Sequence, residues 1–351
     1  FVVLAQRVRP QMIMFIFFAA ANAFAYAVAI GQHMEHDFLN LRYNIASNQY
    51  TKFISTFGNI NMYASYLSIS IPVLLAVFAF CKNWFSRILS GILLIAAGCN
   101  ILIANSDSVF LGIFAGVVVV TILAFMQGRL RYSSFAVFLL FVGNLVLGFI
   151  NKYGHTRYDK KRGGLAIALN RLDIAFVLCG AALLVFAVVC VCNWKLGTRV
   201  AAWNKKKIVL IVCGACVALG VIGIIVLAVT GSSLLTFNDK WGSYRGYIWR
   251  KIVEVYGDAP FVNKLFGYGN ESVRVTLKAA CYNEMVQVTG KVYDNAHNEL
   301  LQYLFTTGIV GLLSYLALVG SSIVYMFKHA KEHAWISVCL AATVGYFAQS
   351  I

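Results

Sequence analysis

The stretch KVYDNAHNELLQYLFTTGIVGLL, residues 291–313, passes from a polar cluster directly into a long apolar run. Beyond Asn298 this run reaches the roughly 20 residues that a helix needs to cross about 30 Å of hydrocarbon. It therefore predicts a membrane-spanning helix with Asp, Asn, His and Glu side chains at its entrance. Such groups are either solvated at the membrane surface or held there for chemistry.

The composition of the whole chain supports a membrane protein. Mean hydropathy is +0.76 and 12% of residues are charged, against about 25% in soluble domains. We predict an all-α polytopic membrane protein, a single integral membrane domain over residues 1–351, with about nine transmembrane helices. The predicted spans are about 11–30, 62–80, 88–105, 109–126, 134–150, 172–192, 208–230, 300–326 and 335–351. Since the chain begins with Phe1 and stops inside an apolar run, we expect it to lack spans at both ends.

The connections between these spans alternate in charge. One set is basic, and it comprises Arg7/Arg9, Lys82/Arg87, Arg129/Arg131, the stretch Lys195–Lys207 and Lys328/Lys331. By the positive-inside rule this set faces the cytoplasm. The other set then faces outward, at about 31–61, 105–108, 151–171 and 231–299. Residues 231–299 form the longest outer loop, and we expect them to form an extracytoplasmic subdomain that carries the functional elements.

The outer loop NKYGHTRYDKKRGGLAIALNR, residues 151–171, stays strongly basic on the side where positive charge is not expected. Guanidinium and ammonium groups gathered there suit a phosphate-bearing ligand. Arg157, Lys161 and Arg162 are therefore candidate substrate-binding residues. The alternative is that the topology is wrong, or that this segment re-enters the membrane.

A second candidate element lies in the 231–299 loop, where GSYRGYIWRKIVEVYGDAPF predicts a helix of about three turns ended by Gly257 and Pro260. An apolar aromatic stripe recurs at every fourth residue, and its members are Tyr244, Ile248, Ile252 and Tyr256. This pattern is typical of a helix in the interface plane, and it equally fits a helix that caps the bundle. Arg245 and Arg250 would then lie at headgroup depth, where a lipid phosphate is found, with Trp249 beside Arg245. Arg250 and Trp249 are therefore candidate substrate-binding residues.

The polar cluster of the first stretch supplies a candidate base. If the helix begins near Asp294, that residue is its N-cap and His297 occupies the third helical position. The helix dipole and partial burial would lower the pKa of His297, leaving a neutral imidazole that can accept a proton. Asn298 lies next to it and is a candidate substrate contact. The alternative is a solvated histidine at the membrane surface.

Other chemistry has little support in the sequence. His33 and His36 have the spacing of metal ligands, but no third ligand is apparent, so we predict no metal and no cofactor. The sequence has no His-Glu-x-x-His, no phosphate-binding glycine loop and no Gly-x-Ser-x-Gly. Its net charge of +16 is accounted for by the membrane and its anionic ligands, without nucleic acid.

Three segments together resemble the O-antigen ligase family of envelope glycosyltransferases, which includes polysaccharide polymerases. Residues 57–75 resemble the family's Asn-rich entry to a span. Residues 244–271 resemble its Arg-x-x-x-Trp helix followed by Pro and a Gly-x-Gly turn. Residues 294–318 resemble its Ala-His-Asn stretch running into Gly-x-x-Gly-Leu.

This resemblance implies metal-independent transfer of glycan from an undecaprenyl-pyrophosphate-linked donor to the hydroxyl of a lipid or glycan acceptor. It places the reaction at the outer face of the bacterial cytoplasmic membrane, among membrane lipids. In the family, a His at the Ala-His-Asn position and an Arg at the Arg-x-x-x-Trp position are essential, and these correspond to His297 and Arg245. Whether the chain is a ligase or a polymerase stays open.

The chain departs from the family at one position. Many members carry Ser-Arg at the outer end of an earlier span, where this chain reads NSDSVFLG, with Asp107 in place of the arginine. The basic 151–171 loop is the candidate substitute. A transporter or flippase for an anionic lipid-linked glycan is the alternative function, and it would predict charged residues near the middle of spans. The predicted spans contain almost none.

Overall fold

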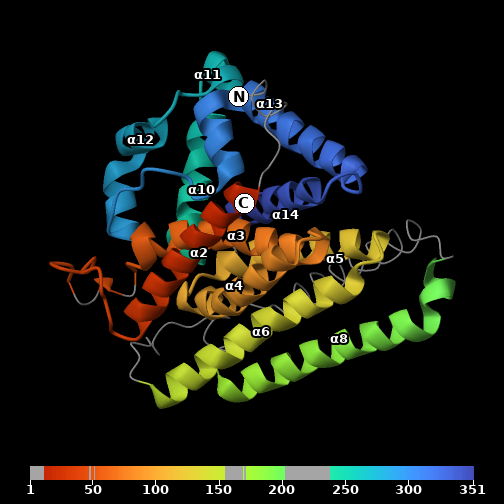
Figure 1. The fold of residues 1–351 in the computed structure, drawn as a ribbon. Coiled ribbons are helices and arrows are strands. Elements are labelled where there is room, and N and C mark those ends of the chain that lie inside the picture. Colours follow the sequence, from red (N-terminus) through yellow and green to blue (C-terminus); the bar gives the residue numbers. More distant parts are fainter. Residues whose placement is uncertain (1–11, 47–48, 51, 155–168, 170, 202–237) are drawn as a thin grey trace, which may run out of the picture. The chain divides into compact units, whose positions relative to one another are not determined.

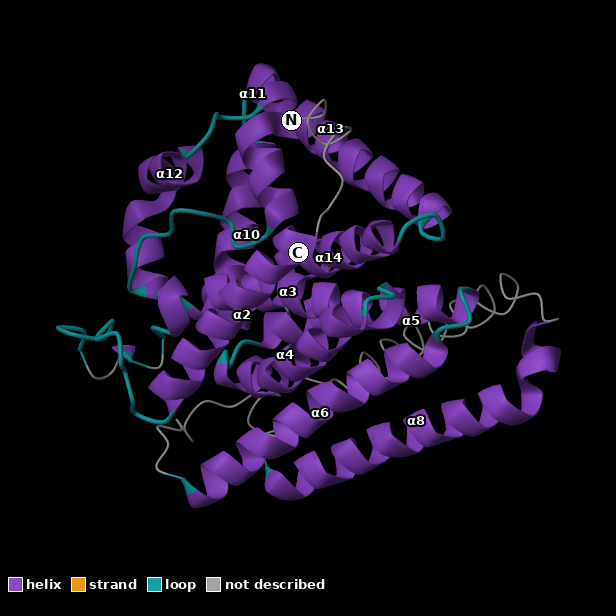
Figure 2. Cartoon of the chain, viewed as in Figure 1, coloured by secondary structure: helices purple, strands orange, loops and turns teal. Residues whose placement is uncertain are grey.

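The computed structural model describes the chain except for residues 1–11, 47–48, 51, 155–168, 170 and 202–237. The described residues form helices joined by loops (Figure 2), which confirms the all-α fold class. Eight helices coincide with predicted spans: α2 (Met12–His33), α3 (Ile60–Phe80), α4 (Trp84–Ile103), α5 (Asp107–Met126), α6 (Leu130–Tyr153), α8 (Leu172–Ala201), α13 (Glu299–His329) and α14 (Ala334–Ser350). Seven of them are long and apolar enough to cross a membrane, and α14 is shorter. The predicted span at 208–230 lies outside the described residues.

The chain divides into two compact units (Figure 1). Unit 1 comprises residues 1–205 and 325–349, and unit 2 comprises residues 206–324 and 350–351. Unit 2 holds the described part of the predicted 231–299 loop as three further helices, α10 (Trp241–Gly257), α11 (Phe261–Phe266) and α12 (Ser272–Thr289). The organisation as one membrane domain stays a prediction.

Short basic connections gather at one end of unit 1. The Arg129 guanidinium donates to the carbonyl of Phe80 at 2.7 Å, which ties the start of α6 to the end of α3. The Gln127 amide donates to the carbonyl of Ala330 at 3.3 Å, which ties the end of α5 to the α13–α14 connection. Three connections that were assigned to the cytoplasm from their charge are therefore neighbours in space.

The connections predicted to face outward meet in the same way. His33 Nε2 lies 2.6 Å from Asn151 Oδ1, joining the end of α2 to the end of α6. The Gln349 amide donates to Ser108 Oγ at 3.4 Å, joining the end of α14 to the start of α5. The alternation read from the charges thus matches the packing of unit 1, while the side that each end faces stays a prediction from the positive-inside rule.

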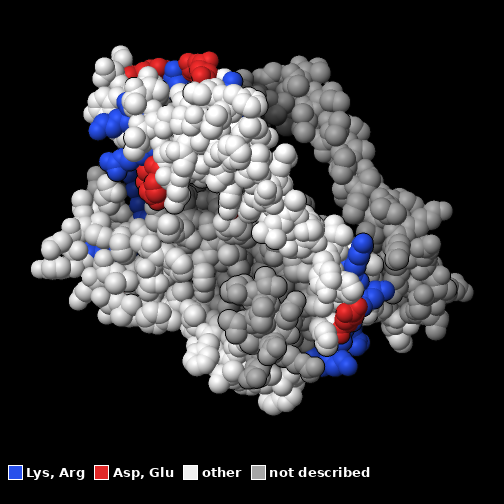
Figure 3. Space-filling view, turned by 90° about the horizontal axis from the view of Figure 1, so that it is seen from above, with Lys and Arg blue, Asp and Glu red and all other residues white. Residues whose placement is uncertain are grey.

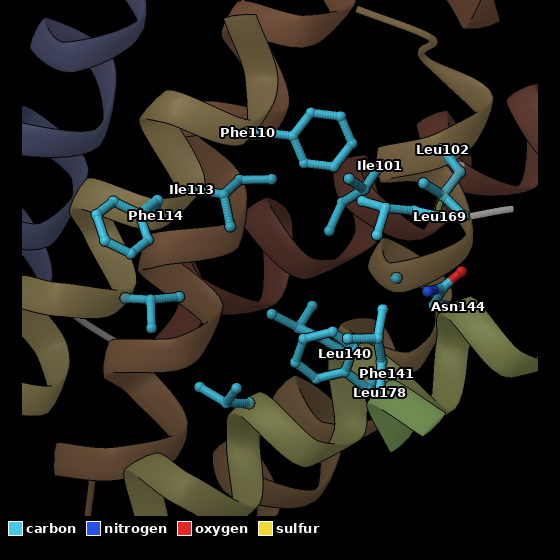
Figure 4. A pocket seen from close by; sticks show the side chains of 13 residues that line it. Ile101, Leu102, Phe110, Ile113, Phe114, Leu140, Phe141, Asn144, Leu169 and Leu178 are labelled. Carbon is cyan, nitrogen blue, oxygen red and sulfur yellow. The ribbon is translucent and has the colours of Figure 1, made fainter. Parts of the chain in front are cut away.

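Unit 1 also contains a cavity of about 410 Å³ between α4, α5, α6 and α8 (Figure 4). Its walls are apolar side chains such as Ile101, Phe110 and Phe141, with Asn144 at its margin. No charged residue belongs to this lining. Because an anionic pyrophosphate needs cationic partners, the cavity is not a candidate for the donor headgroup.

The core of unit 2 is formed where α10, α12 and the start of α13 pack together. Its buried side chains are Tyr247, Ile248 and Ile252 from α10, Val273, Leu277 and Met285 from α12, Tyr293 and Ala296 from the following loop, and Phe305 from α13. The predicted apolar stripe on α10 is therefore present, and residues of α12 and α13 bury it. The apolar face of α10 packs against protein rather than lying bare for lipid.

The boundaries of α10 differ from the prediction. The helix begins at Trp241 and has 17 residues, against the expected three turns, and it ends at Gly257 as expected. Its first turn is irregular, since Gly242 and Tyr244 both have positive φ. Helix α12 was not predicted, although its buried residues Val273, Leu277 and Met285 recur at multiples of four residues; its backbone is kinked at Cys281.

Candidate active site

A break in α13 shapes the site. Gly308 has φ +67° and ψ −173°, which interrupts the helix nine residues after it begins at Glu299. Helical hydrogen bonds cannot continue across such a residue, so carbonyl groups before the break turn to other donors. The amide of Tyr268 donates to the carbonyl of Phe305 at 3.0 Å, and that of Gly269 donates to Thr306 at 2.9 Å. The glycine-rich turn after α11 is thereby joined to α13 by backbone alone.

Two glycines make this junction possible. A Cβ atom at Gly267 would clash with the backbone of Thr306, and one at Gly308 would clash with the backbone of Leu265. Both glycines have positive φ with ψ near 180°, a region essentially reserved for glycine. We call residues 267–269 and 305–308 the glycine junction. It fixes the start of α13, and hence the loop that carries His297.

Replacing Gly308 by alanine is expected to lower the melting temperature of the purified protein. The backbone conformation alone would cost an alanine about 1–3 kcal/mol, and the clash with Leu265 adds to that. Gly320→Ala is the matched control, since Gly320 lies in the same helix and a Cβ atom there meets nothing within 4 Å. Equal melting temperatures for the two variants in detergent or nanodiscs would contradict this role.

The helix entrance has a different register from the one predicted. Asn298, not Asp294, caps α13, since its Oδ1 accepts from the amide of Leu301 at 3.0 Å and the helix begins at Glu299. The expectation that His297 occupies the third helical position is therefore wrong. The physical reason is burial: Tyr293 and Ala296 insert into the core of unit 2, which holds this segment out of the helix.

His297 lies in the loop just before the cap, with φ +50°. Histidine is among the residues that tolerate this left-handed region, at a cost of roughly 1–2 kcal/mol. Three hydrogen bonds hold the segment. The amide of His297 donates to Asn295 Oδ1 at 3.0 Å, the amide of Ala296 donates to Gln302 Oε1 at 2.9 Å, and the carbonyl of Ala296 accepts from Trp249 Nε1 at 2.8 Å.

The ring of His297 is half-buried against Tyr293, edge to face, with centroids 5.9 Å apart. Burial lowers the pKa of His297 below its usual 6.5, and the nearby positive charges of Arg245 and Lys291 lower it further, against the opposing effect of Asp294. Partial burial was expected from the sequence. The second cause of the lowered pKa is the charge of Arg245 rather than the helix dipole. At neutral pH the imidazole of His297 is therefore neutral and able to accept a proton.

Arg245 lies on α10 with its guanidinium half-buried, and desolvation lowers its pKa. Within the described parts of the chain, no carboxylate lies within 4 Å of it and it makes no hydrogen bond. Its charge is therefore uncompensated in a partly desolvated position, where electrostatic interactions are stronger than in water. Such a group favours an anionic ligand.

Neighbouring cations on α10 are neutralised by protein carboxylates. Arg250 Nε and Nη2 donate to the two oxygens of Asp239 at 3.0 and 2.8 Å, and this pair lowers the pKa of that carboxyl. Lys251 Nζ lies 2.8 Å from Glu284 of α12. Figure 3 shows patches in which basic and acidic side chains lie together among uncharged described residues. Arg245 differs from these neighbours in having no such partner among the residues that the structure describes.

The structure places five of the predicted site residues in unit 2, namely His297, Arg245, Arg250, Trp249 and Asn298. The hydrogen-bonding groups of Trp249 and Asn298 are engaged by Ala296 and Leu301, and Arg250 is paired with Asp239. Arg157, Lys161 and Arg162 lie outside the described residues. Asp107 is the first residue of α5, in unit 1.

Sequence reasoning missed Gln302 and Tyr293. Gln302 could have been noticed as a polar residue inside the apolar run ELLQYLF, although its partner is a backbone amide that no pattern marks. Tyr293 belongs to the quoted polar stretch but carries no motif of its own.

Residues 163–316 match the sequence profile of the O-antigen ligase family. The chain carries an O-antigen ligase domain. The matched segment contains Arg245, His297 and the glycine junction, and the resemblance seen in the sequence is confirmed. Together with the membrane-spanning helices, the domain indicates a multi-pass membrane enzyme of the glycosyltransferase type. No curated protein matches the chain.

Proposed function

We propose that this O-antigen ligase domain transfers or polymerises glycan from an undecaprenyl-pyrophosphate-linked oligosaccharide to an acceptor hydroxyl. The reaction would take place at the outer face of the bacterial cytoplasmic membrane. The observation that carries this proposal is the pairing of two groups. A half-buried guanidinium without a counter-ion among the described residues, Arg245, acts electrostatically on a neutral imidazole, His297.

His297 supplies the base in this proposal. A hydroxyl is a weak nucleophile until a base takes its proton during attack. As the new bond forms between the acceptor oxygen and the anomeric carbon, the acceptor proton passes to His297 and the bond to the pyrophosphate oxygen breaks. The pyrophosphate leaves as an anion, so no protonated carboxyl is required for the leaving group.

Arg245 stabilises the charge that develops on that leaving group. A planar guanidinium can donate two hydrogen bonds to neighbouring phosphate oxygens, which suits a diphosphate better than a point charge does. Fixed in a partly desolvated site, it needs little reorganisation as the reaction proceeds. Arg157, Lys161 and Arg162 are proposed as further cations for the diphosphate, replacing the arginine absent at Asp107.

A transporter or flippase remains the second candidate in principle, but the described spans do not favour it. Their charged residues lie in the terminal turns, such as Arg87, Lys152, Asp173 and Lys328, rather than near mid-span. Intramembrane charges mark the substrate pathways of many transporters. The outer-loop cations fit a lipid-linked anion held at the headgroup level, and no nucleic-acid partner is needed to account for them.

The test is in vitro transfer by the purified protein in nanodiscs, with a lipid-linked oligosaccharide donor, a hydroxyl acceptor and EDTA. We expect a covalent glycan–acceptor product and free undecaprenyl pyrophosphate, with EDTA having no effect. Movement of labelled donor across liposomes without any such product would support the transporter instead.

A further inference from the structure

We propose that Trp249 and Gln302 are positioning residues that clamp the backbone of Ala296 from both sides and so aim the side chain of His297. The inference rests on the proposed role of His297 as the base. It reassigns Trp249 from a contact with substrate to a contact with the loop that carries the base. It also gives Gln302 a function that no motif assigns.

The clamp engages both polar backbone groups of one residue. The indole Nε1 of Trp249 donates to the carbonyl of Ala296 at 2.8 Å, and Gln302 Oε1 accepts from its amide at 2.9 Å. The side chain of Ala296 is completely buried in the core of unit 2. Ala296 is therefore fixed at its amide, carbonyl and side chain, one residue before His297.

The two clamping residues come from the helix that carries Arg245 and from the helix that follows the loop of His297. Trp249 lies one helical turn after Arg245 on α10, so the two side chains share a face of that helix. Gln302 lies in the first turns of α13, directly after the loop of His297. The clamp thus ties the base to the helix that carries the guanidinium and fixes their separation.

His297 needs such support because its backbone is in the left-handed region, with φ +50°. For a residue other than glycine this conformation persists only where the surrounding structure imposes it. Without the clamp, residues 296–298 would relax toward more populated conformations, which would turn the side chain of His297 and change its separation from Arg245. An error of about 1 Å in such geometry can reduce the rate by roughly 10²-fold.

Other contacts hold the unit together independently of the clamp. The ion pair of Lys251 with Glu284 and the apolar core join α10 to α12, and the glycine junction joins α11 to α13. Loss of one hydrogen bond at Ala296 should therefore leave the unit folded while loosening the loop of His297. This separates a positioning role from a general structural one.

Two substitutions test the clamp with little change of shape. Trp249→Phe keeps an aromatic ring and removes the N–H donor, and Gln302→Met keeps the length and removes the acceptor. We expect each to lower kcat by about 10-fold or more, with the donor KM changed by less than about twofold. Gln302→Glu keeps an acceptor for the amide of Ala296 and should restore part of the lost rate. Gln287→Met is the matched control, an exposed glutamine on α12 of the same unit.

Two further readouts separate positioning from unrelated damage. Because both residues hold the same backbone, the double variant should lose less activity than the product of the two single losses. The second readout does not use activity: the rate of carbethoxylation of His297 is followed against pH by mass spectrometry of its peptide. In both variants the pH midpoint of this rate should move up toward 6.5, because the ring of His297 becomes less buried and its distance from Arg245 increases.

An unchanged midpoint and unchanged kcat in both Trp249→Phe and Gln302→Met would overturn the clamp. Multiplicative losses in the double variant would do so as well. Failure of the proposed function is recognised by a different result, namely retained transfer by His297→Ala. The carbethoxylation midpoint of His297 tests the clamp alone, because it can be measured in protein that is not catalysing transfer.

Discussion

Replacing His297 by alanine is expected to lower the rate of glycan transfer by about 10²-fold or more, the loss typical of a missing general base. Binding of the lipid-linked donor should be unchanged, because the diphosphate is assigned to Arg245. The measurement is single-turnover transfer with saturating donor, alongside donor binding by the same preparation. His333→Ala is the matched control, an exposed histidine in the α13–α14 connection of unit 1.

The pH dependence of the parent enzyme should report the same group. Because burial and Arg245 lower the pKa of His297 in the free protein, kcat/KM should stay high down to a pH below 6.5 and fall as the imidazole becomes protonated. A bound diphosphate would offset the charge of Arg245, so the acidic limb of kcat should lie at higher pH than that of kcat/KM. His297→Ala should lose this limb. Transfer by His297→Ala at close to the parental rate would contradict the role of His297 as the base. It would support the alternative of a solvated histidine at the membrane surface.

Arg245→Lys is expected to weaken donor binding by about 10- to 100-fold, although it keeps the positive charge. Hydrogen bonds to charged groups contribute roughly 1.5–3 kcal/mol each, and an ammonium group cannot make the paired contacts of a guanidinium. Arg245→Gln should lose at least as much. Binding of fluorescent lipid-linked donor in nanodiscs measures the effect, because it does not require chemistry.

Arg274→Lys provides the matched control for Arg245. Arg274 is exposed on α12 of the same unit, so its replacement should leave donor affinity unchanged. If Arg245→Lys binds donor as tightly as the Arg274→Lys control, the guanidinium contributes at most its charge, and the proposed paired contact with the diphosphate is wrong.

The membrane helices could be predicted from the sequence because hydrocarbon imposes a simple requirement. A spanning helix needs about 20 apolar residues in succession, and this requirement leaves a continuous record in the sequence. The stripe on α10 was visible for a related reason, since Ile248 and Ile252 recur at helical spacing and are both completely buried.

What could not be predicted depends on competition between equivalent local signals. Asp294 and Asn298 are both good N-caps, and the sequence offers no means of choosing between them. The choice is made by tertiary packing, since burial of Tyr293 and Ala296 leaves only Asn298 able to start the helix. The clamp on Ala296 was invisible because its partners are backbone groups.

The glycine junction has a consequence for how this sequence can drift over evolutionary time. Its hydrogen bonds join main chain to main chain, so side-chain identity enters only through the need for Gly267 and Gly308. A lineage that keeps those two glycines can exchange most surrounding residues without losing the joint between the turn and the helix. Such a protein would come to share a sparse family pattern with its relatives and little overall identity.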